Sequence, residues 1–346
     1  MNSSQKIKIL GAGPTGSLLS LGLAKIGCHV EIIDPKDPSA ILKRTRAYAI
    51  THSSRLFLTR INLWEQISKF AQKFDRLVIY DTCTSRSCLF TAENLNINNY
   101  NSNSLGWIIN HQDLMNVLFD NIYTFPNIKT IFSAQTDYLN QDYNLVVGAD
   151  GSKSTLRRKL NIRSLNYKYK QSCLSFQVLM RSAQSSTALE IFRPEGPLAV
   201  LPMRGGSYQI VWTDSPEACL RRCNFKSSYL LDSLASVLPS GFEPECLIST
   251  PQAFPVELSI ARKHFKANQL IIGEASHSFH PVGGQGLNVC WRDVAFLQKS
   301  LSSCISRNTP IKKVITKYSR SRFLDIIFTC FSTHSLIVIF STKFLP

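Results

Sequence analysis

Three glycine-rich stretches carry residue types that bind anions and sugar hydroxyls. They are residues 11–16 (GAGPTG), residues 148–154 (GADGSKS) and residues 273–288 (GEASHSFHPVGGQGLN). Glycine lets a phosphate come close to backbone N–H groups, and a carboxylate placed just after a strand can accept hydrogen bonds from ribose hydroxyls. We therefore expect an anionic, nucleotide-like ligand beside these stretches.

The first stretch stands in the right surroundings for dinucleotide binding. Residues 6–10 (KIKIL) are typical of a short strand, residues 18–24 of an apolar helix, and residues 29–33 of a second strand that ends on Asp34. Strand, glycine loop, helix, strand and terminal acid in this order form the βαβ fingerprint.

Each residue of the fingerprint has an expected task. Gly11 makes the tight turn, Gly13 lets the backbone approach a pyrophosphate, and Gly16 lets the helix pack closely on the strand. Asp34 lies about 20 residues past the glycines, where its carboxylate can bind a ribose.

The other two stretches each follow a buried strand. A strand ending at Gly148 is followed by the Asp150-Gly151 turn and a helix that begins near Ser154. Asp150 is expected either to accept hydrogen bonds from a cofactor hydroxyl or to cap that helix. In the third stretch a helix is expected from about Gly286, and its N-terminus would present N–H groups to an anion.

The composition narrows the class of protein. The chain has 346 residues, 44% of them hydrophobic, and a formal net charge of +16. The Lys and Arg residues are scattered rather than gathered into a stripe with aromatic residues, which argues against a nucleic-acid-binding protein. Ten cysteines without a CxxC pair, and no apolar segment before the first strand, predict reduced thiols and a cytoplasmic protein.

Neither a metal site nor a membrane span is expected. His277 and His280 lack a third ligand nearby, and structural zinc sites need four. Residues 323–346 are the most apolar stretch, but Asp325, His334 and several Ser and Thr residues interrupt them. We interpret this stretch as a helix that is buried or lies on a membrane surface, so the protein is expected to be cytoplasmic and peripheral to a membrane.

The middle of the chain predicts a second, β-rich unit. Residues 174–180, 188–192, 198–202 and 208–212 alternate apolar and polar side chains, as antiparallel strands do. The expected fold class is therefore α/β (α+β, two domains): a Rossmann-type FAD-binding domain with an inserted antiparallel β-sheet substrate domain. We assign residues 1–75, 104–163 and 262–346 to the first domain, and residues 76–103 and 164–261 to the second.

The three stretches, together with Arg157, resemble the motifs of the flavoprotein aromatic hydroxylases that have the para-hydroxybenzoate hydroxylase fold. The resemblance covers nearly the whole chain. Residues 190–192 (EIF), 196–202 (GPLAVLP) and 46–51 (RAYAIT) are similar, more narrowly, to the hydroxylases of ubiquinone biosynthesis.

The resemblance implies FAD as cofactor and NADPH or NADH as reductant. O2 would supply the oxygen added to an aromatic ring, and the substrate would be a small aromatic molecule, such as a prenylated phenol of quinone biosynthesis. A prenylated phenol would imply peripheral membrane contact; no nucleic-acid partner is expected. No catalytic side chain is named. The implied cofactor-binding residues are Gly11, Gly13, Pro14, Thr15, Gly16, Asp34, Arg46, Gln112, Asp150, Gly151, Gly273, Glu274, Pro281, Gly284, Gly286, Leu287 and Asn288.

The inserted sheet would supply an apolar wall beside the flavin. Phe192, Leu201, Met203 and Trp212 are expected to face it.

The chain departs from the family in two ways. Glu274 stands where the family has Asp, so its contact with the ribityl chain must shift. Family members also continue for further helices beyond the region of Tyr318 and Asp325. The alternatives are a flavin-dependent isoprenoid reductase or cyclase, and an inactive FAD-binding homologue.

Overall fold

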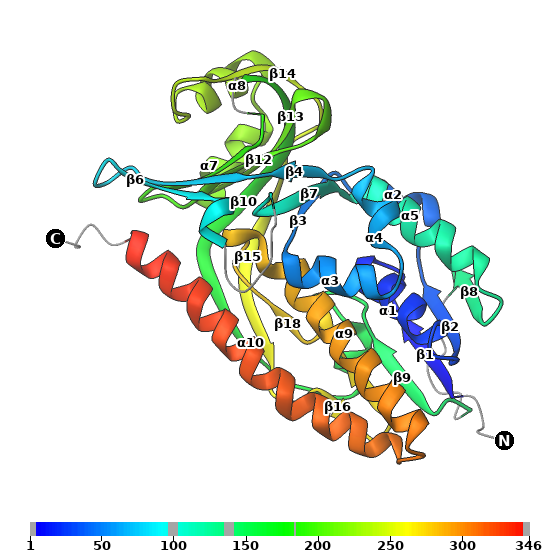
Figure 1. Cartoon of the computed structure of the whole chain (residues 1–346). Helices are drawn as coiled ribbons and strands as arrows, with labels where there is room; N and C mark the ends of the chain where they lie inside the picture. The colour runs from blue at the N-terminus through cyan, green and yellow to red at the C-terminus, as the bar shows by residue number, and fades with distance from the viewer. Residues whose placement is uncertain (1–4, 96–102, 135–141, 183–184, 342–346) are drawn as a thin grey trace.

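A computed structural model describes residues 5–95, 103–134, 142–182 and 185–341. The described chain is built around two large β-sheets and two long C-terminal helices (Figure 1). It is the mixed α/β fold that the sequence predicts.

The first sheet has the order β16-β17-β9-β1-β2-β8. Its strands are parallel except for the edge pair β16 and β17. The central strands β1, β9 and β17 therefore come from three distant parts of the chain, each ending at one of the glycine-rich stretches. The bounds are β1 Lys6–Leu10, β2 His29–Asp34, β8 Ile128–Phe132, β9 Leu145–Gly148, β16 Phe265–Lys266 and β17 Gln269–Ile271.

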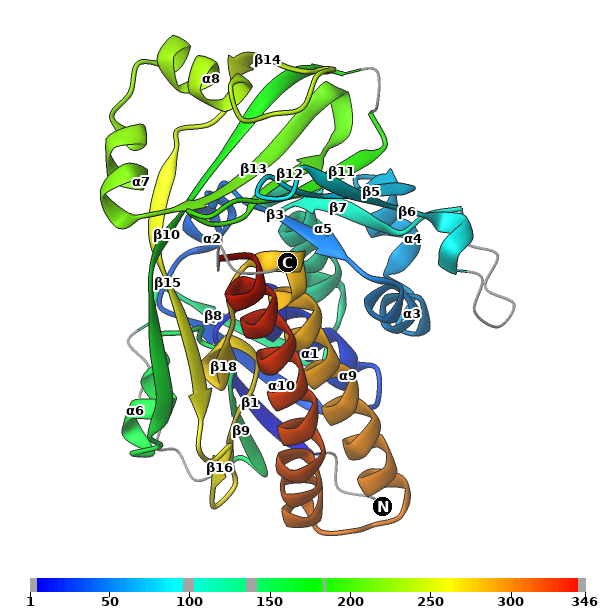
Figure 2. The same cartoon turned by 90° about the vertical axis from the view of Figure 1, so that its left-hand side faces the viewer.

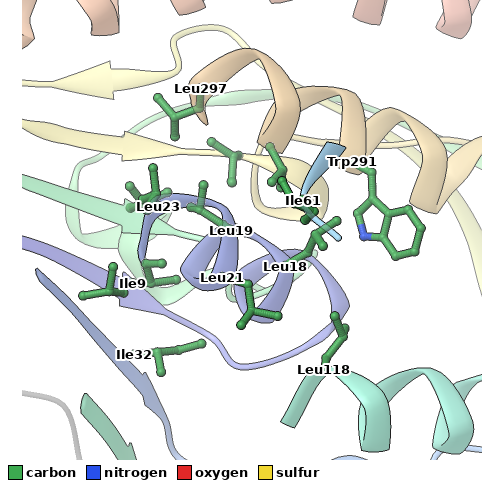
Figure 3. Packing of buried hydrophobic residues seen from close by; sticks show 14 of the residues in the cluster. Ile9, Leu18, Leu19, Leu21, Leu23, Ile32, Ile61, Leu118, Trp291 and Leu297 are labelled. Carbon is green, nitrogen blue, oxygen red and sulfur yellow. The ribbon is translucent and has the colours of Figure 1, made fainter. Parts of the chain in front are cut away.

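Helix α1 (Pro14–Ala24) is apolar on all sides because it is buried on all sides. Leu18, Leu19, Leu21 and Leu23 are completely buried between the first sheet, α5 (His111–Thr124) and α9 (Gln285–Ser306) (Figure 3). Burial of this kind stabilises by about 1.5–3 kcal/mol per leucine, so α1 anchors the loop that precedes it.

The second sheet has the order β18-β15-β10-β13-β12-β11-β5-β6, with β14 paired to β10. It is antiparallel except that β11 pairs with β5 in parallel, because β5 reaches the sheet from a separate excursion of the chain. The bounds are β5 Arg76–Asp81, β6 Arg86–Thr91, β10 Ser164–Ser182, β11 Thr187–Phe192, β12 Leu198–Pro202, β13 Ser207–Asp214, β14 Phe242–Leu247, β15 Gln252–Ala261 and β18 His277–Ser278.

The two faces of this second sheet have different neighbours. Leu189, Ile191 and Trp212 pack in a core with residues of α7 (Pro216–Cys223) and α8 (Ser227–Ala235). Phe192 points to the other face, where it packs with Val282. The expectation for Trp212 was therefore wrong: successive strand residues alternate between faces, and Trp212 belongs to the outer one.

The remaining elements link the two sheets. A small antiparallel sheet, β3-β7-β4, lies beside short helices, and α10 runs along α9 on the outside of the molecule (Figures 1 and 2). Arg44 and Arg46 precede strand β3, which is followed by α3. The bounds are β3 Ala47–Ile50, β4 Gln72–Phe74, β7 Gly106–Asn110, α2 Pro38–Leu42, α3 His52–Arg60, α4 Trp64–Ser68, α6 Thr155–Lys159 and α10 Ile311–Ser341.

Candidate cofactor-binding site

The loop between β1 and α1 is shaped by three glycines with different surroundings. Gly11 has φ +99°, and a Cβ there would lie 2.6 Å from the carbonyl oxygen of Ala149. A Cβ on Gly16 would lie 1.9 Å from the carbonyl oxygen of Gly11. A Cβ on Gly13, in contrast, would have no such neighbour within 4 Å. Gly11 and Gly16 thus serve the packing of the loop, while Gly13 faces open space.

Asp34 holds the same loop from the end of β2. Its Oδ2 accepts the N–H of Ala12 at 2.8 Å, and its Oδ1 accepts the N–H of Lys36 at 2.9 Å. A carboxylate offers about four lone-pair sites, so this one keeps capacity for a ligand hydroxyl.

A cavity of about 230 Å³ brings the three glycine-rich stretches together. Ten of the predicted residues line it: Gly11, Gly13, Pro14, Thr15, Asp34, Arg46, Asp150, Gly151, Glu274 and Leu287. The lining also includes Leu10, Ile33, Pro35, Lys36, Arg44, Tyr48, Ala149, Thr155 and Cys290. Lys36, Arg44 and Arg46 make part of this wall cationic, which suits a pyrophosphate.

The second stretch supplies a carboxylate with one free oxygen. Oδ2 of Asp150 accepts the N–H groups of Thr155 at 2.7 Å and Leu156 at 3.2 Å, so Asp150 does cap the start of α6. Its Oδ1 is buried and has no hydrogen-bond partner among the described residues. Arg157 donates to the carbonyl oxygen of Ala275 at 2.8 Å, which ties the second stretch to the third.

The third stretch is held from behind by Asp293 of α9. Its Oδ2 accepts the N–H of Gly273 at 2.9 Å and lies 2.8 Å from Nε2 of His277, while its Oδ1 accepts Nε–H of Arg322 at 2.6 Å. Burial alone would raise the pKa of Asp293, but His277 and Arg322 hold it well below its ordinary value. Gly273 has φ +58°, so this anchoring fixes an unusual backbone turn directly before Glu274.

Tyr48 and His111 form a neutral pair at the cavity wall. Burial lowers the pKa of His111 to about 4 and raises the pKa of Tyr48 to about 12. Nε2 of His111 lies 2.8 Å from the carbonyl oxygen of Ile41, which can only accept. The proton therefore sits on Nε2, and Nδ1 accepts from the Tyr48 hydroxyl at 2.8 Å.

Asn288 joins the third stretch to β3 and α3. Its Oδ1 accepts from the backbone N–H of Thr51 at 3.0 Å and from the Ser54 hydroxyl at 2.7 Å. Its Nδ2 donates to the carbonyl oxygen of Ala49 at 2.8 Å. The side chain of Asn288 is thus used for positioning, while α9 begins at Gln285, one residue before the predicted start.

Seven predicted residues do not line the cavity. Gly16 and Gly273 lie in the packing behind it, and Gln112 is exposed at the first turn of α5. Pro281, Gly284, Gly286 and Asn288 surround the start of α9, next to Leu287, which does line the cavity.

Two buried titratable groups beside the loop at residues 281–284 were missed by sequence reasoning. Glu190 of β11 is 9% exposed, and burial raises its pKa to about 7 although the N–H of Gly283 lowers it. His280 is 1% exposed; its Nδ1 accepts the N–H of Val282 at 3.2 Å, and burial lowers its pKa to about 4. A polar residue within an otherwise apolar strand (TALEIF) was the signal available for Glu190.

These features fit FAD. Gly13 leaves room for a phosphate at the N-terminus of α1, and the free oxygen of Asp150 can accept a hydroxyl hydrogen bond. Within the described residues no cluster of His, Cys, Asp and Glu could hold a metal ion.

Comparison with known proteins gives the family. A profile described as "FAD binding domain" matches residues 133–324. The 3-demethoxyubiquinol 3-hydroxylase of Escherichia coli is 26% identical, over 85% of this chain and 78% of its own length. The ubiquinone hydroxylase UbiL of Rhodospirillum rubrum is 26% identical, over 98% of this chain and 82% of its own length.

Solved structures show the same fold. The p-nitrophenol 4-monooxygenase PnpA of Pseudomonas putida superposes with a TM-score of 0.81 at 18% identity, over 97% of this chain and 89% of that one. With a profile match over more than half of its length, the chain belongs to the FAD binding domain family, among the relatives of the FAD-dependent hydroxylases.

Proposed function

We propose that this protein is an FAD-dependent monooxygenase that uses NAD(P)H and O2 to hydroxylate an aromatic ring. The observation that carries the proposal is the cavity in which all three glycine-rich stretches meet. The similarity to a 3-demethoxyubiquinol 3-hydroxylase and to a ubiquinone hydroxylase favours a prenylated phenol of quinone biosynthesis as substrate. No observation favours the alternative of an isoprenoid reductase or cyclase.

The chain's own residues would hold the cofactor. The loop at Gly11, Gly13, Pro14 and Thr15 would bind the pyrophosphate, with Arg46 adding positive charge. Asp34 would accept from the ribose hydroxyls.

Asp150, Gly151 and Glu274 would contact the ribityl chain. Leu287 and the backbone around Pro281, Gly284, Gly286 and Asn288 would border the flavin ring. Gln112 would approach from α5, and Gly16 and Gly273 would keep the loops in shape. Bound FAD would take a hydride from NAD(P)H and, with O2, supply the oxygen inserted into the ring.

The two-domain division is part of this proposal. Residues 1–75, 104–163 and 262–346 would bind FAD, and residues 76–103 and 164–261 would shape the substrate side. A prenylated phenol is apolar and would be drawn from a membrane, so we include peripheral contact of a cytoplasmic protein with a membrane.

Glu190 is proposed as the group that accepts the proton of the substrate's phenol. It lies on the same face of the second sheet as Phe192, which packs with Val282 of the loop at residues 281–284. Charge develops on the phenol oxygen as the ring is attacked, and a nearby base with a pKa near neutral is suited to take that proton.

The test is NADPH or NADH oxidation by the FAD-loaded protein, with O2 uptake and product formation measured together. We expect oxidation that depends on O2 and is accelerated by a phenol, with one hydroxylated product per O2 consumed. NAD(P)H oxidation that proceeds at the same rate without O2 would instead identify a reductase. For Glu190→Gln we expect kcat/KM to lose its rise between pH 6 and pH 8.

A further inference from the structure

The outward face of α10 is unusual for an exposed helix. Leu324, Phe328 and Phe331 are 72%, 71% and 70% exposed, and they follow one another at spacings of four and three residues, so they form one stripe. Phe323, Ile327, Val338 and Ile339 are also exposed and widen it. By length and composition, Ile311–Phe340 is the one helix among the described residues that could cross a membrane, and its most apolar 18-residue window has a mean hydropathy of 1.9.

The inward face of α10 holds the helix against the protein. Tyr318, Ile326 and Ile337 are buried there. Arg322 donates to Asp293 at 2.6 Å, and Arg292 of α9 donates to Asp325 at 2.9 Å. A helix anchored by ion pairs along one side, one of them buried, lies on a surface rather than across a bilayer.

The same outward stripe is cationic in its first turns. Lys313, Lys317 and Arg320 are exposed and precede Leu324 at the same three- and four-residue spacing. Asp325 is the one acidic residue in α10, and it is paired with Arg292 and Arg322. The stripe thus offers three charges of one sign, which form no ion pair with any described residue, followed by large apolar side chains.

We propose that this stripe, from Lys313 to Ile339, docks on the surface of an anionic lipid bilayer. Lys313, Lys317 and Arg320 would contact headgroup phosphates, while Leu324, Phe328 and Phe331 enter the boundary between headgroups and acyl chains. The inference rests on the proposed function for its membrane contact, and it adds the contact surface and the charge of the lipid.

The docked helix would lead toward the substrate side. Phe340 stacks on Phe192 with ring centroids 3.9 Å apart, and Ile337 packs with Phe192 and Val282. The C-terminal end of α10 therefore reaches the same loop that Glu190 contacts. In this orientation an apolar substrate would travel from bilayer to loop along one helix.

The experiment is co-sedimentation of the FAD-loaded full chain with vesicles. Phosphatidylcholine vesicles are compared with vesicles in which about a third of the lipid is phosphatidylglycerol. We expect binding to the anionic vesicles that weakens with salt, and at least tenfold weaker binding to the neutral ones. The double variants Phe328→Ser/Phe331→Ser and Lys313→Gln/Lys317→Gln should each lose about tenfold or more in affinity.

The matched control removes exposed apolar side chains elsewhere. Leu220 of α7 and Tyr229 of α8 are 59% and 58% exposed, and Leu220→Ser/Tyr229→Ser should bind vesicles like the parent protein. Equal binding by all variants, or no binding by the parent, would overturn the proposal. So would a dimer in sedimentation velocity that Phe328→Ser/Phe331→Ser converts to a monomer, because a second copy would then cover the stripe.

Turnover of a water-soluble phenol separates the two proposals. If the Phe328→Ser/Phe331→Ser variant keeps that turnover but the parent protein does not bind vesicles, the docking surface is wrong and the catalytic function stands. If the protein binds vesicles but does not oxidise NAD(P)H, the docking surface stands and the catalytic function is wrong.

Discussion

Gly13 and Gly16 are three positions apart, yet a methyl group added to each meets different surroundings. At Gly13 the new Cβ has nothing within 4 Å, and the backbone is at φ −72°, which any residue adopts. At Gly16 it would lie 1.9 Å from a backbone oxygen. One glycine leaves room for a ligand and the other serves the fold.

We therefore expect opposite results from two alanine variants. Gly13→Ala should change the free energy of unfolding of the FAD-free protein by no more than about 0.5 kcal/mol. Its affinity for FAD should fall about tenfold or more, because the added methyl group occupies the space expected for the phosphate. Gly16→Ala should destabilise the FAD-free protein by several kcal/mol, on the order of 3. Urea unfolding and flavin fluorescence titration measure both; a Gly13→Ala protein with unchanged FAD affinity would contradict the pyrophosphate assignment.

Glu190 predicts a stability difference that depends on pH. Burial raises its pKa from 4.5 to about 7, so the folded protein favours the protonated carboxyl. The stabilisation is complete below pH 4.5 and is lost as the pH rises through 7. Glu190→Gln cannot ionise, so its Tm relative to the parent should increase from pH 5 to pH 8. A constant Tm difference over this range would mean that Glu190 does not carry a raised pKa.

At the scale of elements, α9 and α10 support the third glycine-rich stretch through Asp293. Asp293→Asn should cost about 3–5 kcal/mol of stability, because buried Arg322 would lose its one fully buried carboxylate partner among the described residues and keep only the partly exposed Asp325. FAD affinity should fall as well, since the N–H of Gly273 donates to the same carboxylate. Asp325→Asn is the control: its carboxylate is 31% exposed, and its loss should cost about 1 kcal/mol or less. Equal effects of the two variants would contradict the positioning role.

Elements with a strong local pattern were predictable from the sequence. The βαβ unit around Gly11 to Asp34 and the strand before Gly148 follow from glycine spacing and apolar runs. The 19-residue length of β10 was not predictable from the run at 174–180, because its first half is stabilised by pairing with β15 rather than by its own pattern. Helix α7 was missed because it is short and five of its eight residues (PEACLRRC) are charged or cysteine.

The residues of the site were predictable where they belong to a sequence motif, and not where tertiary contacts bring them to the site. Ten of the expected residues line the cavity; eight of them lie in the glycine-rich stretches themselves, and the other two are Asp34 at the end of β2 and Arg46 just before β3. Tyr48 and Glu190 required the structure, because only the pairing of β3 with β7 and of β11 with β5 brings their strands to the site. Trp212 was assigned to the wrong face because alternation alone does not say which face is inward.

At the scale of the whole molecule, buried histidines predict loss of stability in acid. Burial lowers the pKa of His111, His264 and His280 from 6.5 to about 4. The unfolded chain takes up these protons first, so stability is complete above pH 6.5 and is lost as the pH falls toward 4. The paired carboxylate of Asp293 acts in the same direction at lower pH.

The free energy of unfolding from urea titrations should therefore decrease steadily from pH 7 to pH 4.5. His264→Gln should flatten that decrease, whereas His29→Gln, at an exposed position, should leave it unchanged. Parallel pH dependence in the parent and His264→Gln would contradict the buried neutral histidine.

The order of strands in the first sheet has a consequence for how this protein folds during its synthesis on the ribosome. β1 lies between β2 and β9, and β9 in turn pairs with β17. The sheet that contains the dinucleotide fingerprint is therefore completed only by a strand synthesised some 240 residues later. At ordinary elongation rates of about 5–20 residues per second, roughly 10–50 s separate the two. During that interval apolar α1 has neither α9 over it nor Trp291 against Pro14. The apolar surface of α1 is therefore covered only after α9 has been synthesised, and we expect the flavin site, which includes Glu274 and Leu287, to form only then.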